Sequence, residues 1–528
     1  MSFKVLLLDG VDPICAQTFK ERGIQADQPN KLSPEELISI IGEYDGMVVR
    51  SATTVTADLL KHAKNMKVIG RAGVGVDNID IKAATSKGVL VMNTPDGNTM
   101  STAEHTCGMI LAMARNIPDA VNTLKNGGWD RKKYMGTEVY GKTLGIVGLG
   151  KIGTELAKRM SAFGMKIVAF DPFSTQEHAQ ELGIKLVDLD EVLAKADFLS
   201  VHTPLTEKTK GLVSLKNADK LKKGVRLVNC ARGGIYEEAD LIQLIDDGVI
   251  GGAALDVYSQ EPPSPELYKM LSHPKIICTP HLGASTEEAQ EKVAGQIASQ
   301  MADALEQKDY KGSINGKSIA LITNKEVQPY LELAEKLGIA AIQLGPEHAQ
   351  SLEFEYSGDC IKYADILTDG ILKGMLSQYV DDSVNLINAR VYADARGIEI
   401  REVTNNKVKT YKNLITIRLA EGAKYGSISA AIFGESDYRI VEIDNFNIEL
   451  HLEGNIILYQ NIDKPGMLAS VSGVLAKQDI NIAALSLGRS SKGSSAITAV
   501  SVDKKLDQSE VDSIEALEGI KNTRYLSF

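Results

Sequence analysis

The sequence has few cysteines and no C-x-x-C pair, and these absences exclude two classes of protein. The five cysteines of its 528 residues are far apart and odd in number. They are Cys15, Cys107, Cys230, Cys278 and Cys360. This pattern argues against a disulfide framework and against a zinc site. We therefore expect free thiols in a reducing compartment, no metal, and a cytoplasmic location.

Long apolar runs and blocks of positive charge are also missing. No run approaches the roughly 18 apolar residues that span a bilayer, and the apolar run near the N-terminus ends at Asp9, too soon for a signal peptide. Lysine and arginine number 58 against 69 acidic residues, which gives a net charge of −11. We expect neither nucleic acid nor a membrane as a partner. Hydrophobic residues at 44% and charged residues at 24% are typical of globular proteins, and the length suggests three or four domains.

Short apolar runs alternate with helix-length segments over roughly the first 310 residues. Strands are predicted at 4–8, 46–49, 68–70, 90–93, 143–148, 166–171, 198–202, 225–230, 253–257 and 275–279. Helices are predicted between them, for example at 33–42, 57–63 and 237–248. Many of the strands are apolar throughout, as in parallel sheets buried on both faces. The alternation favours doubly wound α/β sheets.

Two such sheets are predicted, because the first run of strands ends near Pro95 and a new strand opens after Gly141. A helical stretch from about 101 to 126 separates them, and a long helix at 287–307 follows the second. We expect this late helix to return to the first sheet. The predicted domains are 1–98 with 286–313, 99–285, 314–453 and 454–528.

The last domain has the clearest order of elements. Strands are predicted at 455–463, 481–489, 495–503 and 523–528, and helices at 465–478 and 508–519, with Pro465 in the first helical turn. The order βαββαβ is that of a ferredoxin-like unit. The segment before it, 314–453, shows mixed strand and helix signals and no recognisable site.

A glycine-rich loop follows the predicted strand at 143–148. Gly148, Gly150 and Gly153 form G-x-G-x-x-G ahead of a predicted helix at 154–163, a pattern in which the backbone approaches a pyrophosphate at a helix N-terminus. The next strand ends in Asp171, 171 − 153 = 18 residues later, where an acceptor for the ribose hydroxyls belongs. No arginine follows Asp171 to hold a 2′-phosphate, so the sequence predicts NAD and not NADP.

Three polar side chains follow predicted strands of the same sheet. His281, Glu261 and Arg232 each come directly after a strand, at the edge where open α/β sheets bind ligands. Taken singly, the arginine and the glutamate would be interpreted as surface ion pairs, and the histidine as structural. Their shared edge favours a base, its carboxylate partner and a cation for an anionic substrate. Two other histidines are not predicted to be catalytic: His105 lies inside a predicted helix, and His202 ends a predicted strand.

The cofactor loop and the segments 229–234, 256–263 and 280–285 together resemble the D-isomer-specific 2-hydroxyacid dehydrogenase family. Further similarity lies in the segments 70–78 and 93–98. The resemblance covers the whole chain and is strongest to the long members, which carry an intervening domain and an ACT regulatory domain. It implies a discontinuous substrate domain, a Rossmann-type NAD domain, an α+β intervening domain and a ferredoxin-like ACT domain.

The resemblance also implies roles for individual residues. His281 would be the acid/base, Glu261 its partner and Arg232 the carboxylate anchor. Substrate binding would involve Arg50, Ser51, Arg71 and Gly73. Cofactor binding would involve Val74, Gly148, Gly150, Lys151, Ile152, Gly153, Asp171, Thr203, Cys230, Ala231, Arg232, Asp256, His281, Gly283 and Ala284. Val74 departs from the family, in which threonine is frequent at this position.

The activity implied is NAD-dependent oxidation of D-3-phosphoglycerate to 3-phosphohydroxypyruvate, the first step of L-serine biosynthesis, in a homo-oligomer that is a tetramer. Positive charge at 129–133 would serve an active site, including one in a neighbouring subunit. L-Serine would be an effector bound by Asn461, Asp463 and Asn481. Two alternatives stay open: oxidation of another 2-hydroxy acid such as 2-hydroxyglutarate or glycerate, and a non-enzymatic NAD-dependent corepressor.

Overall fold

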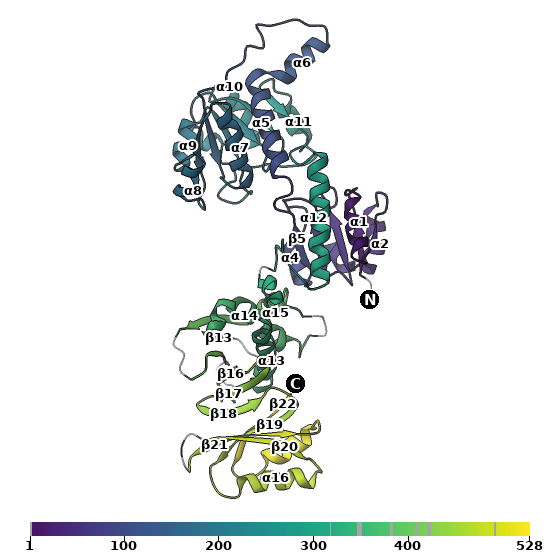
Figure 1. The fold of residues 1–528 in the computed structure, drawn as a ribbon, viewed down its shortest axis with the longest axis vertical. Helices are drawn as coiled ribbons and strands as arrows, with labels where there is room; N and C mark the ends of the chain where they lie inside the picture. Colours follow the sequence, from purple (N-terminus) through teal and green to yellow (C-terminus); the bar gives the residue numbers. More distant parts are fainter. Residues whose placement is uncertain are drawn as a thin grey trace.

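The computed structural model describes residues 3–316, 318–345, 351–380, 384–406, 410–419, 424–489, 491 and 493–528. Within these ranges the chain forms four β-sheets, each with its own helices, arranged along one long axis (Figure 1). The first two sheets are parallel, the third is mixed and the fourth is antiparallel. The predicted fold class is confirmed.

The first sheet has the strand order β2-β1-β3-β4-β5. Its strands are β1 (Lys4–Leu7), β2 (Gln25–Asp27), β3 (Gly46–Val49), β4 (Val68–Arg71) and β5 (Leu90–Asn93). The connecting helices are α1 (Ile14–Glu21), α2 (Pro34–Ile40), α3 (Ala57–His62) and α4 (Ile81–Ser86). Strands β3 and β5 are buried at every position, as expected for strands covered by helices on both faces.

Helix α12 (Glu287–Leu305) packs on the first sheet although it follows the second sheet in the sequence (Figure 1). Its buried residues Val293, Ile297 and Met301 join the core formed with that sheet and α1. Gly70 allows this close approach, because a Cβ there would lie 2.2 Å from the sulfur of Met301. The expected return of the helix is confirmed.

The second sheet has the order β12-β11-β10-β9-β6-β7-β8. Its strands are β6 (Thr143–Val147), β7 (Lys166–Phe170), β8 (Lys185–Leu186), β9 (Phe198–Val201), β10 (Val225–Asn229), β11 (Ile250–Leu255) and β12 (Ile276–Cys278). Its helices are α5 (Thr99–Arg115), α6 (Ile117–Lys125), α7 (Lys151–Ala162), α8 (Gln176–Glu181), α9 (Leu189–Lys195), α10 (Leu241–Asp246) and α11 (Pro265–Leu271). The strand order reverses between β6 and β9, which creates the crevice where such folds bind ligands.

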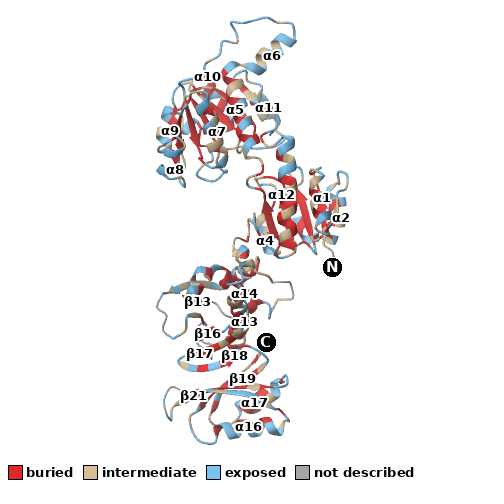
Figure 2. Ribbon diagram, in the orientation of Figure 1, coloured by how far each residue is buried: buried red, intermediate tan, exposed pale blue. Residues whose placement is uncertain are grey.

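The helical stretch predicted from 101 to 126 is two helices and not one. Asn116 adopts a left-handed backbone conformation, with φ of 52°, between α5 and α6. Asparagine tolerates this conformation, and Pro118 then suits the first turn of α6. Helix α6 has no buried residue and projects from the second unit (Figure 2).

Other boundaries also differ from the prediction. Helix α7 begins at Lys151, three residues before the predicted start at 154, because Gly150 is its N-cap. Strands β2 and β8 were not predicted, since short edge strands with polar residues carry little hydrophobic pattern. Short 3₁₀ turns occur at Ile41–Glu43, Leu215–Lys220, Glu238–Asp240, Ser318–Thr323 and Asp359–Tyr363.

The third sheet has the order β14-β13-β15-β16-β17-β18. Its strands are β13 (Ser351–Gly358), β14 (Glu399–Asn405), β15 (Asn413–Arg418), β16 (Ser427–Phe433), β17 (Asp437–Ile443) and β18 (Phe446–His451). Its helices are α13 (Gln328–Leu344), α14 (Ala364–Leu376) and α15 (Ala389–Ala395). Helices α13 and α14 pack closely, since a Cβ at Gly338 would lie 2.1 Å from the carbonyl oxygen of Ile371.

The fourth sheet has the order β20-β21-β19-β22 and two helices, which confirms the βαββαβ unit. Its elements are β19 (Asn455–Ile462), α16 (Met467–Lys477), β20 (Ile482–Arg489), β21 (Ser495–Val502), α17 (Gln508–Glu515) and β22 (Ile520–Ser527). The placement of Pro465 in the first helical turn was wrong. Gly466, with φ of 93°, is the N-cap, so the proline precedes the helix.

The third and fourth sheets share a hydrophobic core. Ile456, Leu458 and Ile497 of the fourth sheet are buried in the same cluster as Leu337 of α13. The other face of the fourth sheet packs on α16 and α17. The two C-terminal units therefore form one continuous body below the first sheet in Figure 1.

All five cysteines are free thiols, as predicted, and four are buried. Burial raises the pKa of the Cys15 thiol to about 12 and that of Cys107 to about 11. In the described part of the chain, no helix combines the length and the apolar character that a membrane span requires.

Candidate active site

Three loops at the carboxyl edge of the second sheet bring the predicted reactive residues together. Arg232 follows β10, Glu261 follows β11, and His281 follows β12. Nδ1 of His281 lies 2.6 Å from Oε2 of Glu261, and both side chains are partly exposed. The loop of Arg232 packs against that of Glu261, because a Cβ at Gly233 would lie 1.9 Å from the backbone of Tyr258.

Two hydrogen bonds fix the position of the Glu261 carboxylate. Besides His281, it accepts a bond of 3.0 Å from the backbone N–H of Tyr258. Burial by itself would raise the pKa of Glu261, but the hydrogen bonds from His281 and Tyr258 outweigh it and lower the pKa below its ordinary value. Glu261 is therefore an anion at neutral pH and favours a proton on Nδ1 of His281.

The backbone of His281 is strained. Its φ of 54° lies in the left-handed region, which costs a residue with a Cβ about 1–2 kcal/mol. We call residues 279–284 the catalytic loop. A conformation of this kind persists only where the surroundings fix it, and here they do so mainly through Asp256.

Asp256 is fully buried and anchors the catalytic loop. Its carboxylate accepts hydrogen bonds from the hydroxyl of Thr279 (2.6 Å) and the backbone N–H groups of Leu282 (2.7 Å) and Gly283 (2.9 Å). His105 lies 3.2 Å away. Burial by itself would raise the pKa of Asp256, but the bonds from His105, Thr279 and Leu282 outweigh it and hold the pKa below its ordinary value.

Arginines from both units face the same region. Arg232 donates through Nε to Asp77 of the first unit at 2.9 Å. Arg71, at the end of β4, is partly buried, and its Nε has no hydrogen-bond partner among the residues that the structure describes. Burial and the charges of Arg232 and Arg50 outweigh the opposing charges of Asp77 and Asp9, and they lower the pKa of Arg71 to about 10. A partly buried, incompletely paired guanidinium with other arginines nearby is suited to an anionic ligand.

The other predicted substrate residues lie next to these arginines. The backbone N–H of Arg50 donates to Asp9 at 2.8 Å, which fixes the loop after β3, and Ser51 is exposed. Gly73 lies directly against Arg71, since a Cβ there would be 1.6 Å from Nη1. The structure thus brings Arg50, Arg71, Gly73 and Arg232 into one neighbourhood.

The glycine loop has the shape that a dinucleotide requires. Gly148 has a φ of 98°, and a Cβ there would lie 2.4 Å from the carbonyl oxygen of His202. A Cβ at Gly153 would lie 2.2 Å from the carbonyl oxygen of Gly148, whereas Gly150 has open space around it. The loop therefore turns tightly on the protein side and is open at the N-terminus of α7, where a pyrophosphate fits.

Asp171 follows β7 and braces the glycine loop. Its carboxylate accepts bonds of 2.7 Å from the backbone N–H groups of Leu149 and Phe173. A carboxylate has about four acceptor positions, so two remain for the hydroxyls of a ribose. Within the described part of the chain, the buried hydroxyl of Thr203 has no hydrogen-bond partner, and it is a further donor near the loop.

The remaining predicted cofactor residues are distributed around this edge. Lys151 begins α7 and forms an ion pair with Asp96, and Ile152 follows it in the first turn. The carbonyl oxygen of Val74 accepts a bond of 2.5 Å from the amide of Asn93. Cys230 is buried, the N–H of Ala231 donates to Asn229 (3.0 Å), and the carbonyl of Ala284 accepts from Gln290 (2.6 Å).

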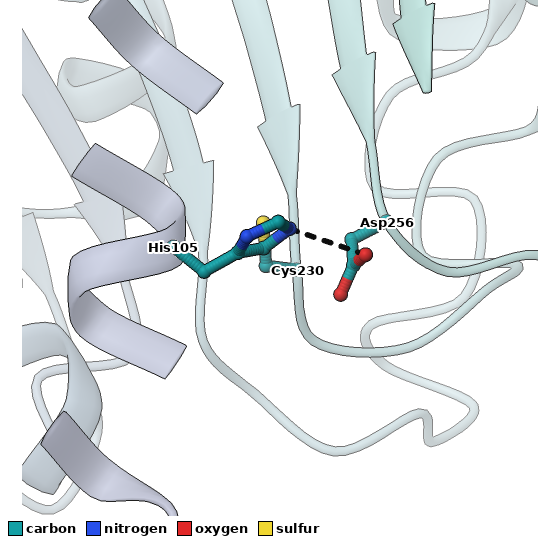
Figure 3. Close-up of side chains that lie close together, drawn as sticks. All are labelled: His105, Cys230 and Asp256. Atoms are coloured by element: carbon teal, nitrogen blue, oxygen red, sulfur yellow. Dashed lines mark ion pairs between the residues drawn. The ribbon is translucent and has the colours of Figure 1, made fainter. Parts of the chain in front are cut away.

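His105, Cys230 and Asp256 lie close together (Figure 3), with Cys230 and Asp256 buried and His105 partly buried. Their ligand atoms lie within 4.8 Å of one another, and in the described residues they are the one group of this kind. Burial raises the pKa of Cys230 to about 12, so a metal-binding thiolate is costly, and the oxygens of Asp256 are already occupied by N–H and O–H donors. The arrangement favours a hydrogen-bonded network over a metal site.

Sequence reasoning missed the role of His105 in this network. The available signal was the spacing of Thr102, His105 and Thr106 on one face of a helix, where polar side chains are otherwise expected to face solvent. His202 is different. The residue is partly buried, burial of its ring lowers its pKa to about 4, and Nε2 lies 2.9 Å from the hydroxyl of Ser200.

The three predicted effector residues do not meet within one chain. Asn461 is buried and accepts from Thr498 at 3.0 Å. Asp463, just beyond β19, accepts from the N–H of Gly493 at 2.9 Å. Asn481 precedes β20 and donates to Asp503 at 2.6 Å. Through β21, the start of β20 is aligned with the start of β19, so Asn481 and Asp463 lie at opposite ends of the sheet.

Fold and site together define an NAD-dependent oxidoreductase with a Rossmann-type cofactor domain. The "D-isomer specific 2-hydroxyacid dehydrogenase, NAD binding domain" family matches residues 107–283. The "D-3-phosphoglycerate dehydrogenase intervening domain" matches residues 326–444, and the ACT domain matches residues 455–519.

Relatives that match over the full length identify the family more specifically. The chain is 40% identical to the D-3-phosphoglycerate dehydrogenase of Bacillus subtilis over 98% of this chain and 97% of the relative. It is 39% identical to that of Archaeoglobus fulgidus over 99% of both chains. The chain therefore belongs to the D-3-phosphoglycerate dehydrogenase family.

Solved structures resemble the first two units. The TT0316 protein of Thermus thermophilus is 30% identical, with a TM-score of 0.54, and covers 59% of this chain and 100% of its own. The D-lactate dehydrogenase of Aquifex aeolicus, solved with NAD and lactic acid, has a TM-score of 0.51 over 58% of this chain and 96% of its own. At 24% identity, the second likeness concerns the fold alone.

Proposed function

We propose that the protein oxidises D-3-phosphoglycerate to 3-phosphohydroxypyruvate, as the names of its full-length relatives suggest. The observation that carries this proposal is the His281–Glu261 pair beside a group of arginines from two units. A histidine with a carboxylate partner suits removal of a hydroxyl proton, and several cations suit a substrate that carries both a carboxylate and a phosphate.

We assign the proton transfer to His281 and the binding of the anionic substrate to the arginines. Because Glu261 accepts the proton on Nδ1 of His281, the lone pair on Nε2 is available to take the proton of the C2 hydroxyl. Arg232, which forms an ion pair with Asp77, binds the substrate carboxylate. Arg71 and Arg50 bind the phosphate.

The cofactor site supports NAD. NAD, when bound, accepts the hydride that leaves C2. The open space at Gly150 admits the pyrophosphate, Asp171 binds the ribose hydroxyls, and Thr203 and the segments 230–232 and 281–284 line the remainder. Asp256 contributes by holding the catalytic loop in place.

A panel of substrates tests this proposal. We expect kcat/KM for D-3-phosphoglycerate to exceed the values for D-glycerate and D-2-hydroxyglutarate, because a phosphate offers Arg71 and Arg50 more charge and more acceptor oxygens than a hydroxyl or a second carboxylate. A higher kcat/KM for 2-hydroxyglutarate would favour the second candidate, a dehydrogenase for another 2-hydroxy acid. The alternative of a non-enzymatic corepressor is disfavoured, because the full-length relatives are named as dehydrogenases.

The proposal extends to assembly and regulation. We propose a homo-oligomer, a tetramer, because α6 and the segment after it expose Ile117, Val121, Leu124, Trp129 and Met135, an apolar surface that a second copy would cover. Residues 129–133 would then bring positive charge to a neighbouring subunit. L-Serine would bind between ACT domains, with Asn461 and Asp463 from one copy and Asn481 from another.

We also propose a separate binding function for each of three domains. Residues 1–98 with 286–313 would bind the substrate, 99–285 the cofactor and 454–528 the effector, with 314–453 between them. A cytoplasmic location is supported by the five free thiols.

A further inference from the structure

His105 reaches the catalytic loop from the helix that follows the crossing between the first two units. Helix α5 begins at Thr99, a few residues after β5 ends at Asn93. The hydroxyl of Thr102, one turn before His105, donates to the carbonyl oxygen of Gly283 at 3.1 Å. The first two turns of α5 therefore support the back of the loop that carries His281.

The hydrogen bonds around His105 determine its tautomer. The hydroxyl of Thr279 gives its single proton to Asp256 at 2.6 Å, so its oxygen can only accept from Nε2 of His105, 3.1 Å away. The same Nε2 lies 3.2 Å from Oδ1 of Asp256 (Figure 3). Nε2 must therefore carry a proton, shared between the hydroxyl and the carboxylate.

These contacts fix the loop on both sides of His281. Thr279 is bound through its hydroxyl to Asp256, and through its carbonyl to the hydroxyl of Tyr258 at 2.8 Å and the N–H of His281 at 3.0 Å. Asp256 binds the N–H groups of Leu282 and Gly283. His281 lies between these anchors in its left-handed conformation.

We propose that His105 is a positioning residue for the reaction. Its Nε2–H fixes Thr279 and Asp256, and these hold the catalytic loop so that Nδ1 of His281 stays against Glu261 and Nε2 faces the substrate. His105 touches neither substrate nor cofactor in this role. The inference rests on the proposed acid/base function of His281.

The first test compares His105→Leu, which removes the donor, with His105→Gln, whose amide N–H can reach the same acceptors. His178→Leu, on the exposed face of α8, is the matched control. We expect His105→Leu to lower kcat about 10- to 100-fold with KM for phosphoglycerate within about threefold. The deuterium isotope effect with 2-deuterated substrate should rise, because hydride transfer becomes slower than product release. His105→Gln should recover most of the loss, and the control should match the wild type.

The second test does not depend on activity. Hydrogen exchange at the amides of Leu282 and Gly283 should be faster in His105→Leu than in the wild type and near normal in His105→Gln. Unchanged exchange in His105→Leu, or equal loss of kcat in both variants, would overturn the inference. If His281→Ala keeps its turnover while His105→Leu still speeds exchange, the acid/base role proposed for His281 has failed, whereas the anchoring of the loop by His105 stands.

Discussion

Both the dehydrogenase site and the candidate effector site were predicted from the sequence, yet the structure brings together the residues of the first and separates those of the second. Arg232, Glu261 and His281 are spread over 50 residues of sequence and meet at one edge of the second sheet. Asp463 and Asn481 are closer in sequence but lie at opposite ends of the fourth sheet. Separation in sequence therefore did not indicate, in either case, which residues lie close together in space.

The reason is strand direction. In a parallel sheet every strand ends at the same edge, so residues after successive strands converge. In the βαββαβ unit, β19 and β20 run in the same direction, but Asp463 follows β19 while Asn481 precedes β20. A site that uses both must combine two copies of the chain. Four predictions test this contrast.

The largest effect is expected at the convergent edge. His281→Ala should lower turnover about 10²- to 10⁴-fold, because the acid/base is lost, while the affinity for NADH stays nearly unchanged. Steady-state kinetics and fluorescence titration of NADH measure the two quantities. Turnover near the wild-type value would show that His281 is not the acid/base.

A smaller effect is expected from loss of the partly buried cation Arg71. Arg71→Met keeps much of the side-chain volume and removes the charge, so KM for D-3-phosphoglycerate should rise about 10- to 100-fold, the cost of a lost charge-assisted hydrogen bond. The KM for NAD should change little. If KM for D-glycerate rises as much as that for the phosphorylated acid, Arg71 does not bind the phosphate.

The next effect concerns cofactor choice. Asp171→Ala should weaken NAD binding about tenfold, as expected for loss of a hydrogen bond of about 1.4 kcal/mol, and should improve NADP relative to NAD because the repulsion of a 2′-phosphate disappears. Because Asp171 also braces the glycine loop, a melting curve of the variant is the control. An unchanged ratio of kcat/KM for NAD and NADP would contradict its role as ribose ligand.

The smallest effect on basal turnover is expected in the ACT domain. Asp463→Ala and Asn481→Ala should each abolish inhibition by L-serine with little change in basal activity. Co-expression of the two variants should restore part of the inhibition, because a hybrid pair contains one site with both native residues. Absence of any recovery would place the site within one chain, and calorimetry without serine binding to the wild type would exclude an effector site for serine.

Local pattern was sufficient where a residue acts at the end of a strand. The strands at 46–49 and 90–93 were predicted at their observed bounds, since their buried apolar runs are unambiguous. Position relative to such strands was enough to predict four of the site residues: Gly148, Gly150, Asp171 and His281. The break at Asn116 was missed, because a left-handed asparagine inside an apolar helical pattern leaves the periodicity almost unchanged.

The residues at the sheet edge could be predicted from the sequence, because the alternation of strands and helices dictates where each strand ends. What those residues contact depends on how the elements pack in three dimensions. The unpartnered nitrogen of Arg71 among other arginines, the bond from His105 to the anchor of the catalytic loop, and the separation of Asn481 from Asp463 all depend on contacts between segments far apart in the chain. Periodicity reports which face of an element is buried, whereas the partner on that face is set by how the elements pack.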